Sequence, residues 1–98
     1  MDSQIEFPPK AIYQIANIMA TQNSADPNYM KGPELVSLFN VLGYPDAYTF
    51  SDGRGIQTVD YGEGLSRLTY VTKRLLDLNK VYQVPNAIQE FIKRAQQP

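Results

Sequence analysis

Apolar residues recur at intervals of three and four residues in four segments of the chain, which is the spacing of an amphipathic helix. The segments cover residues 9–22, 32–43, 67–80 and 86–95. Their apolar positions are Ile12, Ile15, Ala16 and Met19; Leu35, Leu38, Phe39 and Leu42; Leu68, Val71, Leu75 and Leu78; and Ile88, Phe91, Ile92 and Ala95. Four such stripes must be buried against one another. We therefore predict a mainly α fold, a small helical bundle forming a single domain over residues 1–98.

Residues that favour helix ends bracket these segments. Gly32 is predicted to cap the second helix, because Pro33 then falls in its first turn. Gly43 can adopt the left-handed conformation that ends a helix. Ser66 and Asn86 are predicted to cap the third and fourth helices, since their side chains can accept from free backbone N–H groups.

A long connection over residues 45–64 separates the second helix from the third. Its sequences "DGRG" and "YGEG" are typical of tight turns, because glycine takes positive φ at low cost. A short strand or a 3₁₀ turn fits "YPDAYTF" and "IQTVDY". The sequence thus predicts a glycine-rich arm between two helices, either irregular or folded as a small β-hairpin.

The glycines of this arm do not form a phosphate-binding motif. In "GRGIQT" a threonine stands where a dinucleotide fingerprint has its third glycine, and the next predicted helix starts about ten residues later. A P-loop requires Gly-Lys, and this pair does not occur in the chain. The remaining alternative to simple turns is a binding loop that presents Arg54.

The composition removes most catalytic chemistry. The 98 residues include no cysteine and no histidine, which excludes thiolate and imidazole metal sites and the Ser-His-Asp and Cys-His systems. Four acidic residues share the arm, namely Asp46, Asp52, Asp60 and Glu63, but they lack the spacing of a cation-binding loop. We expect a protein that is not an enzyme and that binds no cofactor or metal ion.

The net charge of −1 provides no global attraction to nucleic acid or anionic lipid. The N-terminal "MDSQIEFPPK" lacks the apolar core of a signal peptide, and no apolar run reaches the roughly 18–20 residues of a membrane span. We expect a cytoplasmic protein with no membrane contact.

Several exposed-looking side chains are candidates for binding a protein partner. Leu76 lies about 120° from the apolar stripe of the third helix, as expected from 100° per residue. Either the core wraps around this helix or Leu76 faces a partner. Tyrosines bring large, stiff interface area, although half-buried packing is the more ordinary explanation for any single tyrosine. The candidate binding residues are Tyr48, Arg54, Tyr61, Arg67, Tyr70 and Leu76.

The third helix also carries basic residues around an aromatic one, a combination that can follow a phosphate backbone and stack a base. These residues are Arg67, Tyr70, Lys73, Arg74 and Lys80. With Arg54 they define the alternative function, a nucleic-acid-binding helical module. The other interpretation is a solvated basic face with Asp77 as its counter-charge.

Two sequence runs, "GPELVSLFNVLGYPDAY" and "LSRLTYVTKRLLDLN", resemble a small helical domain near the N-terminus of bacterial abortive-infection (phage-defence) proteins. The matching positions are Gly32, Pro33, Leu35, Val36, Phe39, Asn40, Leu42, Gly43, Tyr44, Ser66, Arg67, Tyr70, Leu75 and Asn79. Asn40, Arg67 and Tyr70 are the polar members of this set that packing does not obviously require.

The resemblance implies an accessory sensor or adaptor domain joined to a toxic effector such as a ribonuclease. Such a ribonuclease needs an Arg…His signature, which a chain without histidine cannot supply. Because the chain ends after the fourth helix, the effector is expected on a separate chain or on a longer parent. We predict a non-enzymatic interaction domain that binds a protein, including a second copy of itself, in a bacterial defence or regulatory system.

Overall fold

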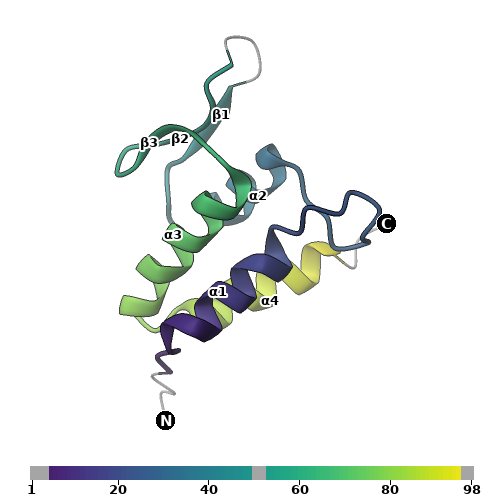
Figure 1. Ribbon diagram of the computed structural model, residues 1–98. Coiled ribbons are helices and arrows are strands. Elements are labelled where there is room, and N and C mark those ends of the chain that lie inside the picture. The colour runs from purple at the N-terminus through teal and green to yellow at the C-terminus, as the bar shows by residue number, and fades with distance from the viewer. Residues whose placement is uncertain (1–4, 50–52, 96–98) are drawn as a thin grey trace.

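The structure, a computed structural model, describes residues 5–49 and 53–95 and contains four helices and a small sheet (Figure 1). In chain order the elements are α1 (Pro9–Met19), α2 (Gly32–Val41), β1 (Ala47–Thr49), β2 (Gly55–Thr58), β3 (Gly62–Leu65), α3 (Arg67–Lys80) and α4 (Val84–Ala95). The predicted helical bundle with an arm between its second and third helices is confirmed. The arm is a three-stranded antiparallel sheet that projects from one end of the bundle.

One apolar core joins all four helices to the sheet. Its fully buried members include Ile12, Ala16, Leu35, Leu38, Phe39, Ile56, Val71, Leu75, Val84 and Ala87. Most predicted stripes supply core residues. The stripe of the fourth helix was partly wrong, because α4 buries Val84 and Ala87 while Ile92 remains 48% exposed. This helix therefore carries apolar residues in addition to those that it buries in the core of the domain.

Two predicted helix ends are wrong and two are confirmed. Asn86 lies inside α4, which starts at Val84 with Pro85 in its first turn. Proline suits that turn because its missing N–H has no helical partner there. Gly32 is the first residue of α2 and follows the N-cap position. Ser66 does cap α3, since its hydroxyl accepts from the Thr69 N–H at 3.1 Å.

Gly43, the other confirmed end, follows α2 with φ +106°. The first helix is shorter than predicted and ends at Met19, where Ala20 leaves helical geometry.

The sheet has the order β1-β2-β3, and only its first two strands were anticipated. Ile56 pairs with Leu65 and Gln57 with Glu63, so Gly64 is an extra residue that forms a bulge. Its φ of +74° is a conformation that glycine adopts readily. Because β3 contains two glycines, strand propensity gives no signal for it.

Candidate functional site

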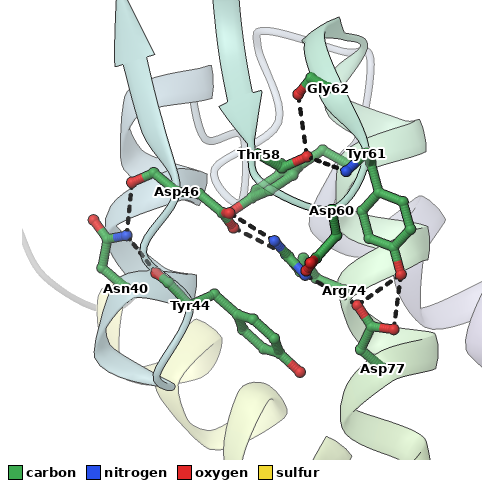
Figure 2. A network of polar contacts seen from close by, with 10 residues as sticks. Asn40, Tyr44, Asp46, Thr58, Asp60, Tyr61, Gly62, Arg74 and Asp77 are labelled. Atoms are coloured by element: carbon green, nitrogen blue, oxygen red, sulfur yellow. Dashed lines mark hydrogen bonds and ion pairs between the residues drawn. The ribbon is translucent and has the colours of Figure 1, made fainter.

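The sheet is joined to α3 by a buried ion pair between Arg74 and Asp46 (Figure 2). The guanidinium binds the carboxylate through two bonds, Nη2 to Oδ1 at 2.6 Å and Nε to Oδ2 at 2.9 Å. The Arg74 side chain is 1% exposed and the Asp46 side chain 0% exposed. Asp46 immediately precedes β1. The expectation that Arg74 belongs to a solvated basic face is therefore wrong, because this charge is neutralised inside the protein.

Two further carboxylates and two aromatic rings complete the surroundings of Arg74. Its Nη1 donates to Asp60 at 2.9 Å and to Asp77 at 3.0 Å. The rings of Tyr44 and Tyr61 lie 4.2 and 5.2 Å from the guanidinium carbon. Burial acts to lower the pKa of Arg74, but the hydrogen bonds to Asp46, Asp60 and Asp77 raise it overall. The predicted counter-charge role of Asp77 is confirmed.

The turn between β2 and β3 delivers Asp60 and Tyr61 to this cluster. The Thr58 hydroxyl accepts from the Tyr61 N–H at 2.7 Å and donates to the Gly62 carbonyl at 3.1 Å (Figure 2). These two bonds hold a tight three-residue turn between the paired ends of the strands. The arm is therefore fixed to α3 at its base and at its turn.

Tyr70 lies in the core and is 0% exposed. Its hydroxyl donates to Asp46 at 2.7 Å, and its ring packs edge-on against Phe39 at 5.4 Å between centroids. Burial and the bond to this carboxylate raise the pKa of Tyr70. The prediction that Tyr70 contacts a partner directly is wrong, because its side chain is not exposed. Tyr70 instead orients the arm through its bond to Asp46.

Arg67 and Asn40 also make contacts within the chain. Arg67 donates to the Met30 carbonyl at 2.8 Å and to the Thr21 carbonyl at 2.9 Å, so it holds the connection between α1 and α2. Asn40 donates to the Tyr44 carbonyl at 2.7 Å and to the Asp46 carbonyl at 3.0 Å. Asn40, Arg67 and Tyr70 thus each hold a loop in place.

Tyr48 lies on the sheet and Arg54 next to it. Tyr48 is half-buried, and its ring covers the start of α2, where a Cβ on Gly32 would be 2.5 Å from the ring atom Cε2. Gly32 is thus used for this close approach. Arg54 is exposed and immediately precedes β2. Neither side chain is among the described residues that line the groove in which Tyr61 and Leu76 meet.

Leu76 and Tyr61 meet in a groove of about 380 Å³ between the N-terminal segment, α3 and the β2–β3 turn. We call it the α3 groove. Its lining residues are Glu6, Phe7, Pro9, Tyr61, Lys73, Leu76, Asp77, Asn79 and Lys80. Leu76 is half-buried: it packs against the core and also faces the groove. Both interpretations of its position off the apolar stripe therefore hold in part.

One wall of the α3 groove is Phe7, which the sequence did not single out. The Asn79 side chain accepts from the Phe7 N–H and donates to the Phe7 carbonyl, both at 2.8 Å. This pairing fixes the backbone of the N-terminal segment against α3. No local sequence pattern predicts a contact between residues this far apart. Asn79 is, however, one of the positions on which the resemblance to the abortive-infection domain rests.

Two polar side chains of the groove, Asp77 and Lys73, lie next to Tyr61. Its hydroxyl lies 2.8 Å from both carboxylate oxygens of Asp77. Burial and this bond raise the pKa of Tyr61 to about 12. Lys73 places its Nζ 4.9 Å from the centre of the same ring, and Lys80 is exposed at the end of α3. The site combines apolar walls with two amino groups and with the carboxylates of Glu6 and Asp77. Asp77 already accepts from Tyr61 and Arg74. The two amino groups suit an apolar side chain next to a carboxylate.

Across residues 5–49 and 53–95, every buried side-chain nitrogen and oxygen has a hydrogen-bond partner, and no acidic cluster is placed to hold a metal ion. The resolved pKa shifts, those of Tyr44, Tyr61, Tyr70 and Arg74, all move away from neutral pH. None of the helices described has the length and apolar character needed to cross a membrane. Comparisons with protein-family models, curated proteins and solved structures found no match.

Proposed function

We propose that this protein is a non-enzymatic interaction domain, a sensor or adaptor, that binds a protein partner in the α3 groove. The observation that carries the proposal is the convergence of Leu76 and Tyr61 in one groove. They come from a helix and from a turn, and the sequence predicts each as an interaction residue for a separate reason. Interfaces concentrate such aromatic and aliphatic anchors at their centre.

The lining indicates the chemistry of the partner. Phe7, Tyr61 and Leu76 form apolar walls for a protruding apolar side chain. Lys73 and Lys80 lie beside these walls and can pair with an acidic residue on the partner. The ion pair of Arg74 with Asp46 keeps the arm in place before binding, so little ordering entropy is lost when a partner docks.

A binding role rather than catalysis is supported by the protonation behaviour of the site. A general acid or base works best when its pKa lies near the operating pH. The pKa of Tyr61 is instead raised to about 12, and Arg74 remains charged. These groups serve as fixed hydrogen-bond partners. The setting in a bacterial phage-defence or regulatory system rests on the family resemblance of the two sequence runs.

The alternative, a nucleic-acid-binding module, loses two of its cations to internal contacts. Arg74 is buried with Asp46, and Arg67 donates to two backbone carbonyls. On α3 this leaves Lys73 and Lys80 for phosphate contacts, and few phosphate contacts give weak binding. We therefore retain nucleic acid only as an outcome of the experiment.

The test is an affinity capture from lysate of the source cell with tagged wild type, Leu76→Asp and Val41→Asp. Val41 is 61% exposed at the end of α2 and is absent from the described lining of the groove, so it is a matched control. We expect wild type to capture a partner protein whose retention survives nuclease treatment. Leu76→Asp should lose this partner, and Val41→Asp should retain it. A thermal melt of each variant separates loss of binding from loss of fold.

Three results would contradict the proposal. Capture that Leu76→Asp leaves intact would remove the α3 groove as the binding site. Capture that disappears with nuclease, or that falls by orders of magnitude with a modest rise in salt, would favour the nucleic-acid module. A melting transition abolished by Leu76→Asp, together with unchanged capture by Lys80→Glu, would show that Leu76 acts only in the core.

A further inference from the structure

The surface formed by α1 and α4 is more apolar than their packing in the core requires. Each helix has a buried stripe and, next to it, a second apolar stripe with the spacing of three and four residues used in helix packing. The buried stripes are Ile12, Ala16 and Met19 on α1, and Val84, Ala87 and Phe91 on α4. The second stripes are Ala11, Ile15 and Ile18 on α1, and Ile88, Ile92 and Ala95 on α4.

The second stripes border a groove of about 380 Å³ between the two helices. Ile15, Ile18, Ile88 and Ile92 line it, and Phe91 contributes from the core side. Ile18 is 58% exposed and Ile92 48% exposed, so both are raised knobs at the groove. In Figure 1 the two helices lie along the side of the bundle away from the sheet. The face thus presents two exposed apolar side chains, Ile18 and Ile92, next to a groove that is itself lined mainly by apolar side chains.

Charge identifies the kind of surface that fits this face. Residues 11–25 contain no charged residue, although this segment includes most of α1. The exposed positions of α1 within it are Tyr13, Gln14, Asn17 and Ile18. Depletion of charge is characteristic of interface centres. In a twofold interface the residues close to the axis face their own copies, so an uncharged helix there avoids repulsion between identical charges.

We infer that this face binds a second copy of the chain. An antiparallel pairing of α1 with α1 of the partner places the Ile18 knob of each copy at the groove of the other. The two layers of α1 and α4 then form a four-helix bundle across the dimer. This interface shares no lining residue with the α3 groove. The protein can therefore dimerise through one face and bind its partner through the other.

The experiment measures the mass of the purified protein in solution by sedimentation and by light scattering over a range of concentrations. With wild type, we expect the mass to rise towards twice the chain mass of 11.1 kDa. Ile18→Asp and Ile92→Asp should each raise the dissociation constant at least about tenfold, because each substitution acts twice in a symmetric dimer. Val41→Asp, on an exposed position of α2, should leave it unchanged.

A wild type that remains at monomer mass up to about 1 mM would overturn the inference, since 1 mM corresponds to a very weak complex. So would a dimer that withstands both Ile18→Asp and Ile92→Asp, or one that Val41→Asp weakens equally. Ile18 is exposed in the monomer, so its variant should melt like wild type at concentrations low enough that both are monomeric. Capture dependent on Leu76 involves the other face, and the two proposals can fail separately.

Discussion

Replacement of Arg74 by methionine tests the idea that one buried cation fastens the sheet to the helices. The substitution keeps an unbranched chain in the core and removes the guanidinium. Asp46, whose side chain is 0% exposed, then loses both of its bonds from Arg74 and keeps the bond from Tyr70. Asp60, which is 58% exposed, regains water instead. Most of the loss in the free energy of unfolding therefore comes from one carboxylate, that of Asp46, which is buried and loses its cation.

The size of the effect follows from this geometry. Removal of one partner from a buried ion pair costs about 3–5 kcal/mol. An exposed ion pair contributes only about 0–1 kcal/mol, so Asp60→Asn is the matched control. A domain of this size typically has about 5–15 kcal/mol of stability, and Arg74→Met should consume a large part of it. At roughly 4–8 °C per kcal/mol, its melting temperature should fall by more than about 10 °C.

The assay is urea unfolding at pH 7 followed by far-UV circular dichroism, with the free energies of unfolding compared at a common slope. The double variant Arg74→Met with Asp46→Asn tests the cause. Because the double variant has no unpaired buried charge, its free energy of unfolding should be about 1 kcal/mol or more higher than that of Arg74→Met. The reasoning is refuted if Arg74→Met costs no more than Asp60→Asn, or if the double variant is less stable than Arg74→Met.

Three other outcomes are expected. The pKa of Tyr61 is raised from 10.0 to about 12, so its stabilising bond is complete below pH 10.0 and is lost as the pH rises towards 12. Urea midpoints should fall across this window, and they should fall less in Tyr61→Phe. Gly32→Ala should cost about 1–3 kcal/mol, because its Cβ would lie 2.5 Å from Tyr48, and a Tyr48→Ala background should remove most of that cost. Asn79→Ala should cost about 1–3 kcal/mol and speed amide hydrogen exchange at Phe7, whose N–H it leaves without the Asn79 acceptor; unchanged exchange would refute the pairing.

The fold could be predicted where its cause is local. The stripes of the first three helices and the Ser66 cap depend on residues within a few positions of each other, and the structure agrees with them. The start of α4 was missed because Pro85 occupies its first turn and Asn86 offers a competing cap. The strand β3 was missed because its glycines carry no strand propensity; its pairing with β2 decides its conformation.

The candidate site was predictable only in part. Leu76 is predictable because it departs from the apolar stripe, and it does face a groove. Arg67 and Tyr70 are also predicted to bind a partner, but each contacts its own chain. On an isolated helix, a polar residue that will bind a partner looks the same as one that will bind a loop. Only the position of the covering segment distinguishes them.

By itself, the sequence determined the kinds of chemistry that are absent and the places where helices form. A chain without histidine or cysteine lacks imidazole and thiolate whatever its fold, and helical periodicity is set within a few residues. Tertiary structure alone decided that Arg74 meets Asp46 and that Phe7 meets Asn79. Those pairs are far apart in the chain, and their geometry exists only after the apolar stripes have packed. Burial then makes the bonds strong, because water no longer competes for the same polar groups.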